Sequence, residues 1–155
     1  MSTYKSVLFV CWGNVCRSPS AELMLKNEIK RSGADNVRIE SAGVGADHDT
    51  ARPSFSMWIA ALLRGLWLRP TPRLFRRQDF SKFDLIVAMD REVRDSIGML
   101  AREEVSNVKL LSDFLPLDWP LDVPDPMNRP FGECNRVLDM LDKGCGAIGA
   151  QLMPG

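Results

Sequence analysis

Several residue types and patterns are scarce in this sequence, and each scarcity excludes a class of protein. The chain has one histidine and one Cys-x₄-Cys pair without a second pair, which is a poor ligand set for zinc. No hydrophobic run approaches the ~20 residues that span a bilayer. The N-terminus lacks the long apolar core of a signal peptide. We therefore expect a cytoplasmic protein with no bound metal and no membrane partner.

The chain also lacks an excess of charge of either sign. Twenty Lys and Arg balance twenty Asp and Glu in 155 residues. A balanced chain has no overall attraction to nucleic acid, so we expect no nucleic-acid partner, and a bound anion must be held by local geometry. The length suits one domain covering residues 1–155. In the cytoplasm, cysteines are normally thiols, here Cys11, Cys16, Cys134 and Cys145.

Short apolar runs alternate with helical patterns along the chain. Runs typical of buried strands cover residues 6–10, 37–41, 83–90 and 107–111. The first helical pattern has Pro19 in its first turn and runs to about 32. Further helical patterns cover 54–65 and about 92–100, and a last one begins near 133. This alternation predicts a single doubly wound α/β domain, with a central four-stranded parallel sheet and helices on both faces. The proline-rich residues 116–130 form a long loop, and loops of this length are often functional.

The segment Cys-Trp-Gly-Asn-Val-Cys-Arg-Ser, residues 11–18, follows the first predicted strand. Ligands of open parallel sheets bind at such strand ends. Gly13 and Asn14 tolerate a tight turn, which lets successive N–H groups surround an anion beside a helix N-terminus. Arg17 offers a planar fork for phosphate oxygens. These surroundings favour a thiolate, so Cys11 is a candidate nucleophile for phosphorus, and Ser18 can donate to its sulfur. The alternative for Cys11 is an inert buried thiol.

Displacement of an alkoxide or phenoxide requires a proton donor opposite the nucleophile. The long loop and its approach contain four candidates, Asp113, Asp118, Asp122 and Asp125. From the residues alone, the choice among them stays open.

Residues 11–19 resemble the signature of the low-molecular-weight protein tyrosine phosphatase family. The blocks ESAG (40–43), DFSKFDLIVAMD (79–90) and DVPDP (122–126) resemble the family in the same order. The resemblance implies hydrolysis of phosphotyrosine or aryl phosphate monoesters through a cysteinyl-phosphate, without a cofactor. It implies Cys11 as nucleophile, Arg17 as phosphate binder and Asp125 as general acid. The implied substrate-binding and supporting residues are Trp12, Gly13, Asn14, Val15, Cys16, Ser18 and Ser41, with Ser41 holding Asn14. The implied partner is a tyrosine-phosphorylated protein or a small aryl phosphate, and we expect a monomer or weak dimer.

The sequence departs from the family at positions that flank the substrate ring. Asp47 or His48 and Met127 stand where members carry aromatic residues, and this bears on the preference for phosphotyrosine rather than on phosphoryl transfer. Trp12 either replaces an aromatic wall at the rim or is buried against the neighbouring helix. Cys16 either packs beneath the loop or forms a reversible disulfide with Cys11.

Two other functions compete. An arsenate reductase-like enzyme would need further cysteines near the third strand, and residues 79–105 contain none. A non-catalytic phosphoprotein-binding module would keep Arg17 while losing Cys11 or the acid. Protein arginine phosphatases also resemble this chain, but they usually carry threonine at the position of Val15. The sequence therefore predicts a protein tyrosine phosphatase.

Overall fold

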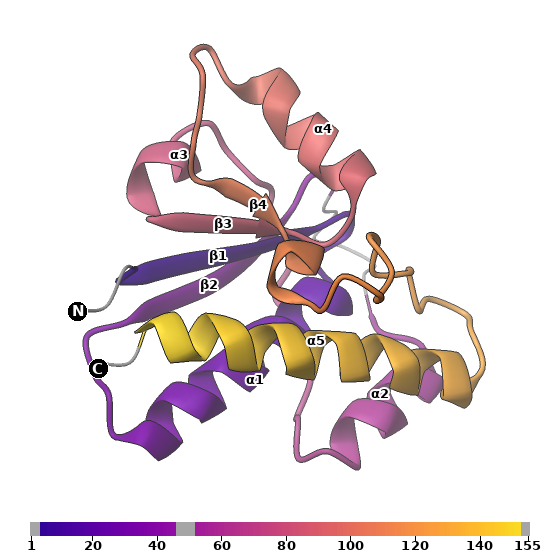
Figure 1. The fold of residues 1–155 in the computed structure, drawn as a ribbon. Helices are drawn as coiled ribbons and strands as arrows, with labels where there is room; N and C mark the ends of the chain where they lie inside the picture. The colour runs from indigo at the N-terminus through magenta and orange to yellow at the C-terminus, as the bar shows by residue number, and fades with distance from the viewer. Residues whose placement is uncertain (1–3, 46–51, 153–155) are drawn as a thin grey trace.

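The computed structural model describes residues 4–45 and 52–152. Its sheet has four parallel strands: β1 (Ser6–Cys11), β2 (Arg38–Gly43), β3 (Leu85–Ala88) and β4 (Val108–Leu110). Their order is β2-β1-β3-β4 (Figure 1). The chain winds from β1 to β2 and then to β3 and β4 on the other side, so the order reverses at β1. The predicted doubly wound α/β sheet is confirmed.

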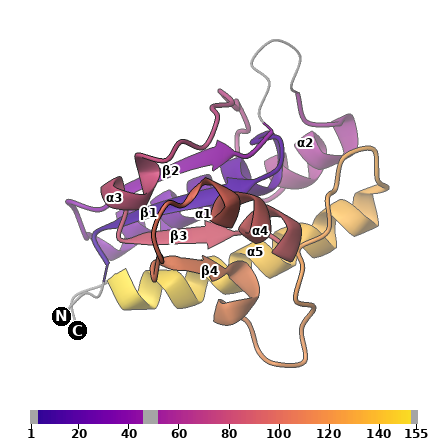
Figure 2. The same ribbon diagram turned by 90° about the horizontal axis from the view of Figure 1, so that it is seen from above.

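Helices cover both faces of this sheet. The helices α1 (Arg17–Ser32), α2 (Phe55–Leu62) and α5 (Phe131–Leu152) lie on one side. The short helix α3 (Asp79–Lys82) and helix α4 (Arg91–Leu100) lie on the other (Figures 1 and 2). No helix within residues 4–45 and 52–152 combines the length and the hydropathy needed to cross a bilayer.

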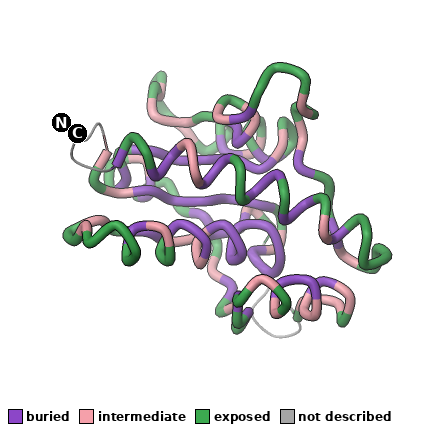
Figure 3. Tube along the Cα trace, turned by 60° about the horizontal axis from the view of Figure 1, so that its bottom comes forward, coloured by how far each residue is buried: buried purple, intermediate pink, exposed green. Residues whose placement is uncertain are grey.

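The central strands are buried on both faces, which explains their continuous apolar sequences. Val7 and Phe9 of β1 belong to the core that includes α1, α2 and α5. Leu8 and Val10 alternate with them and belong to the second core, beside α4. Figure 3 shows this burial as purple through the centre of the molecule, with green on the outer turns. The first strand is therefore held rigidly up to its carboxyl end at Cys11, where the candidate site begins.

The predicted element boundaries differ from the observed ones by a few residues. Helix α1 begins at Arg17, which puts Pro19 in its first turn as expected, whereas α5 begins at Phe131 rather than near 133. The strand expected over 83–90 is limited to β3, because Asp90 already caps α4. Helix α3 and the 3₁₀ helix η1 (Leu111–Phe114) were not predicted, since four residues are too few for a hydrophobic period. The long loop from 116 to 130 contains no helix or strand, as predicted.

Candidate active site

The loop formed by residues 11–18, called the phosphate-binding loop below, connects β1 to α1 at the edge where the strand order reverses. Asn14 has φ 56°, which is the left-handed backbone expected from its residue type. The end of β2 lies close beneath the loop. A Cβ at Gly43 would lie 2.6 Å from the carbonyl oxygen of Trp12 and 2.9 Å from the backbone nitrogen of Asn14. Only glycine permits this approach.

The sulfur of Cys11 lies inside the loop, and the residue is 2% exposed. The Ser18 Oγ lies 2.9 Å from the Cys11 Sγ. The backbone N–H of Asn14 donates to the same sulfur at 3.2 Å. An ionised sulfur has no proton, so the Ser18 hydroxyl and the Asn14 N–H would both donate to it, and two such donors stabilise an anionic sulfur more than a neutral thiol. The geometry therefore suits a nucleophilic thiolate and fits poorly with an inert packing role.

Arg17 is 4% exposed and is held by two acceptors. Its Nη1 donates to the Asp90 Oδ2 at 2.7 Å and to the carbonyl oxygen of Val123 at 2.9 Å. Asp90 lies two residues after the end of β3 and accepts the Val93 N–H at 2.8 Å as the N-cap of α4. One carboxylate thus joins the arginine to the start of a helix. We did not predict Asp90 as a site residue, although its place at the carboxyl end of β3 is a signal for one.

The structure distinguishes among the four candidate acids. The Asp113 Oδ2 accepts the Leu110 N–H at 2.9 Å and closes the start of η1. Asp122 forms a two-pronged pair with Arg91, and hydrogen bonds from that guanidinium lower the pKa of Asp122. A carboxyl group with a lowered pKa is a poor proton donor at neutral pH. Asp118 and Asp125 are both exposed and remain as candidates.

Asp125 lies two residues after Val123, the point at which the long loop contacts Arg17. Its Oδ1 accepts the Met127 N–H at 3.0 Å, which fixes the turn around Asp125. The next part of the loop is attached to α5, because the Cys134 Sγ lies 3.6 Å from the carbonyl oxygens of Pro126 and Arg129. These contacts favour Asp125 over Asp118. They also show that Cys134 is buried and attaches the long loop to α5, a contact that the sequence did not reveal.

A hydrogen-bond network surrounds the Asn14 side chain. Its Nδ2 donates to the Ser18 Oγ and to the Ser41 Oγ, both at 2.9 Å, and its Oδ1 accepts the Arg73 N–H at 3.0 Å. Ser41 in turn donates to the Glu22 Oε1. The predicted contact between Ser41 and Asn14 is thus present, whereas Glu22 and Arg73 were not predicted.

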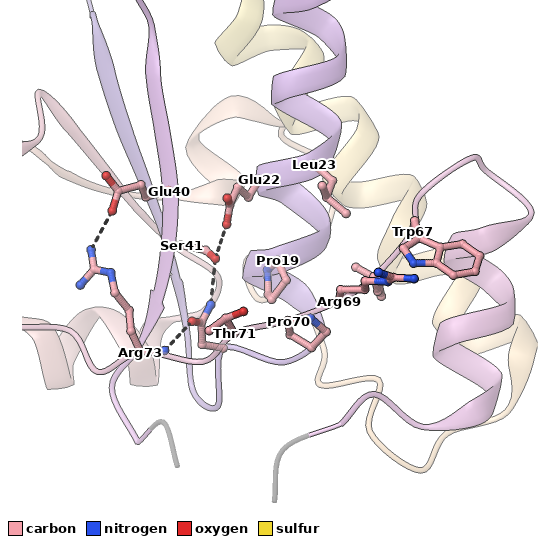
Figure 4. Close-up of a pocket in the computed structure, with 12 residues that line it drawn as sticks. Pro19, Glu22, Leu23, Glu40, Ser41, Trp67, Arg69, Pro70, Thr71 and Arg73 are labelled. Atoms are coloured by element: carbon pink, nitrogen blue, oxygen red, sulfur yellow. Dashed lines mark hydrogen bonds and ion pairs between the residues drawn. The ribbon is translucent and has the colours of Figure 1, made fainter. Parts of the chain in front are cut away.

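The outer part of this network borders a cavity of about 350 Å³. Figure 4 shows two of the lining contacts as dashed lines, one from Ser41 to Glu22 and one from Arg73 to Glu40. Other lining residues include Pro19, Glu40, Trp67, Arg69 and Thr71. The cavity lies beside the phosphate-binding loop, and Asn14 is the only loop residue before Pro19 that lines it.

The remaining loop residues divide into buried and exposed groups. Val15 and Cys16 are 5% and 4% exposed, and burial raises the pKa of Cys16 to about 12. Trp12 is 48% exposed and lies against Gly45, where an added Cβ would be 2.8 Å from the indole Cε2. The indole therefore occupies the rim rather than a buried position against a helix. Asp47 and His48, which stand where an aromatic wall was expected, lie outside the described residues.

Fold and site together define a cysteine-dependent phosphatase architecture, and comparison with known proteins identifies the family. Residues 6–154 match the family model described as "Low molecular weight phosphotyrosine protein phosphatase". The chain belongs to this family, and it is a hydrolase of the protein phosphatase class. The resemblance found in the sequence is therefore confirmed.

Curated and structural relatives cover nearly the same length. The Bacillus subtilis low molecular weight protein-tyrosine-phosphatase YfkJ is 32% identical over 150 residues, covering 95% of each chain. The Schizosaccharomyces pombe low molecular weight phosphotyrosine protein phosphatase is 40% identical over 134 residues, which is 83% of this chain and 86% of that one. The structure of tyrosine phosphatase Wzb from Escherichia coli K30, solved with sulphate, superimposes with a TM-score of 0.83 at 26% identity, covering 97% and 99% of the chains.

Proposed function

We propose that this phosphatase hydrolyses aryl phosphate monoesters, including phosphotyrosine, in two displacement steps at Cys11. The observation that carries the proposal is the pair of polar contacts to the Cys11 sulfur, from the Ser18 hydroxyl at 2.9 Å and the Asn14 N–H at 3.2 Å, beside a buried arginine. Such a site combines a stabilised nucleophile with a binder for a phosphate dianion. The relative Wzb was solved in complex with sulphate, an ion similar to phosphate in shape and charge, and this supports a phosphate-like ligand for the present chain.

In the first step, the Cys11 thiolate attacks phosphorus and the bond from phosphorus to the ester oxygen breaks. Asp125 donates its proton to that oxygen, so a neutral phenol leaves. In the second step, water attacks the phosphorus of the cysteinyl-phosphate while the Asp125 carboxylate takes the proton from that water. The sulfur leaves as a thiolate and inorganic phosphate is released. Arg17 binds the phosphate oxygens throughout, and Ser18 donates to the departing sulfur.

The proposed substrate class follows from the apolar and aromatic side chains of the loop. Val15 is apolar, and the half-exposed Trp12 offers a ring face at the rim. These side chains suit an aryl group better than a guanidinium phosphate. The proposed partner is accordingly a tyrosine-phosphorylated protein or a small aryl phosphate, encountered in the cytoplasm by a one-domain monomer or weak dimer.

Turnover of para-nitrophenyl phosphate in the presence of a chelator tests the mechanism. C11S should abolish turnover. D125N should lower kcat by ~10²–10⁴ for poor leaving groups and much less for good ones, which need little protonation. D118N is the matched control and should leave the leaving-group dependence unchanged. Near wild-type activity of C11S would refute the mechanism, and a loss in D118N with none in D125N would transfer the acid to Asp118.

The two competing functions are separated in the same experiments. Arsenate reduction at the expense of thiols, without aryl phosphate turnover, would indicate the reductase. Tight binding of a phosphotyrosyl peptide with no release of phosphate would indicate a binding module. Val15→Thr, compared on phosphotyrosine and phosphoarginine peptides, tests whether this position selects the aryl ester.

A further inference from the structure

We infer that Glu22 is a positioning residue for the nucleophile. It acts through Ser41 and Asn14, and it fixes the direction of the hydrogen bonds that end at the Cys11 sulfur. The inference rests on the assignment of Cys11 as the nucleophile and goes beyond it, because Glu22 is linked to the Cys11 sulfur through Ser41 and Asn14.

The orientation of the Asn14 amide is determined by one backbone group. The N–H of Arg73 lies 3.0 Å from the Asn14 Oδ1. A backbone N–H is only a donor, so the atom facing it must be the carbonyl oxygen rather than the amide nitrogen. The Nδ2 of Asn14 therefore faces the Ser18 and Ser41 hydroxyls and donates one hydrogen to each.

Each serine oxygen now accepts a hydrogen from Asn14 and has one proton of its own to give away. The Ser41 proton goes to the Glu22 Oε1, 2.5 Å away. The Ser18 proton has two acceptors within reach, the Cys11 Sγ at 2.9 Å and the carbonyl oxygen of Ala42 at 3.3 Å. The shorter contact and the negative charge of a thiolate favour the sulfur. The hydrogen bonds of the network therefore run outward from the Asn14 amide, and they end at two acceptors, the Glu22 carboxylate and the Cys11 sulfur.

Glu22 is the acceptor that maintains this polarity. Without it, the Ser41 proton has no acceptor in the network and points back toward the Asn14 Nδ2, which repels it. Asn14 is then held less firmly, although both donors to the Cys11 sulfur depend on it: its own N–H, and the Ser18 hydroxyl that it orients. Loss of the acceptor should therefore weaken the stabilisation of the thiolate.

Helix geometry places Glu22 for this role. Ser18, Glu22 and Lys26 are spaced four residues apart on α1 and so share one face. Ser41 of β2 lies opposite that face, and Lys26 donates to the second carboxylate oxygen of Glu22. The other charged groups around Glu22 are Glu40, Arg69 and Arg73, which line the same cavity (Figure 4).

The test measures the pH dependence of Cys11 alkylation by iodoacetamide, a neutral reagent, with mass spectrometry to confirm the alkylated site. We chose E22L because leucine fills space beside the cavity, whereas alanine would leave room for a water acceptor. E22L should move the alkylation midpoint upward by roughly one pH unit, the size expected when a hydrogen bond to an ionised group is lost. E22Q keeps a carbonyl acceptor for Ser41 and should not move the midpoint upward.

The direction of the shift separates this role from a direct effect of charge. Removing a negative charge near a thiolate favours the thiolate, so a through-space effect would lower the midpoint in both variants. E28L removes a carboxylate from another face of α1 and is the matched control. S41A supplies a further check, since E22L should add no shift once Ser41 is absent.

An unchanged or lowered midpoint in E22L would overturn the proposal, and so would an equal E22L shift in the S41A background. If E22L does not fold, E22M serves instead, because methionine is unbranched and a good helix former. It should give the same upward shift. C11S inactivity together with an unmoved E22L midpoint would reject the role of Glu22 while leaving the proposed function intact.

Discussion

Replacement of Asp90 by asparagine should reduce catalysis more than it reduces stability. The Asp90 carboxylate serves Arg17 with one oxygen and the α4 cap with the other, at 2.7 and 2.8 Å. Asparagine has one carbonyl oxygen and can serve only one of these two donors. If the oxygen caps α4, the amide hydrogens face the guanidinium. If it faces Arg17, the Val93 N–H loses its acceptor.

The magnitude follows from the contact that is lost. A hydrogen bond to a charged group contributes about 1.5–3 kcal/mol, and each 1.4 kcal/mol is about a factor of ten. We expect kcat/KM of D90N to fall about 10- to 100-fold, with a similar rise in the inhibition constant of inorganic phosphate. Stability should fall less, because asparagine is as good an N-cap as aspartate and the Arg17 guanidinium keeps the Val123 carbonyl. A loss of about 1 kcal/mol would lower Tm by roughly 2–4 °C.

The assay combines initial rates on para-nitrophenyl phosphate, phosphate inhibition and thermal melting. D122N is the control, since it removes a carboxylate from the exposed pair with Arg91 near the same helix start. It should leave kcat/KM within about twofold, because exposed ion pairs contribute little. If D90N retains wild-type kcat/KM and phosphate inhibition, then Asp90 only caps α4 and does not position Arg17.

Three further outcomes are expected. Trp12→Ala should lower kcat/KM about two- to tenfold for aryl phosphates and less for alkyl phosphates, because a ring contact contributes ~0.5–1.5 kcal/mol; an equal loss for both would make the indole structural. Burial raises the pKa of Cys16 to about 12, so the fraction of Cys16 present as thiolate rises about tenfold with each pH unit while the pH is below that pKa. Closure of a Cys11–Cys16 disulfide after peroxide, measured as activity recovered by dithiothreitol, should be faster at pH 8 than at pH 7 and depend on Cys16; recovery equal in Cys16→Ser would leave it as packing. Gly144→Ala places a Cβ 2.7 Å from Leu111 and should lower stability by ~1–3 kcal/mol, whereas Gly146→Ala, with nothing within 4 Å, should raise it by up to ~1 kcal/mol; equal melting shifts would contradict the packing argument.

The parts of the site that could be predicted from the residues themselves lie together along the chain, whereas the contact of Ser41 with Asn14, 27 residues apart, came only from the family resemblance. The phosphate-binding loop is one run of eight residues between a strand and a helix, so its local geometry is encoded locally. Asn14 adopts the left-handed backbone that its residue type permits. Arg17 lies near the end of the phosphate-binding loop, where α1 begins. The buried strands could be predicted from the sequence as well, because a strand covered on both faces must be apolar at nearly every position.

The parts that were missed join residues far apart in the sequence. Arg17 and Asp90 are 73 residues apart, and Ser41 and Glu22 are 19 apart. A hydrogen bond of this kind depends on the packing of the strand ends to within a few tenths of an ångström, which no periodic pattern reports. From the residues alone, without the family resemblance that implied Asp125, the choice among the four aspartates stayed open for the same reason, since only the structure shows Asp113 and Asp122 engaged by other partners.

The buried residues of the site and its more exposed residues differ in how freely they can be substituted, and this difference has a consequence for substrate choice. Cys11, Asn14 and Arg17 are each at most 4% exposed. Cys11 and Asn14 share Ser18 as a partner, and Arg17 is held separately by Asp90 and by the Val123 carbonyl, so a change at any of the three disturbs buried hydrogen bonds. Trp12 is half-exposed, and Met127 is only partly buried. Substitution of exposed side chains rarely costs much stability. Under the proposed function, the side chains at the rim can therefore vary while the phosphoryl-transfer geometry is retained. Met127, one of the departures from the family's aromatic walls, is not among these buried residues.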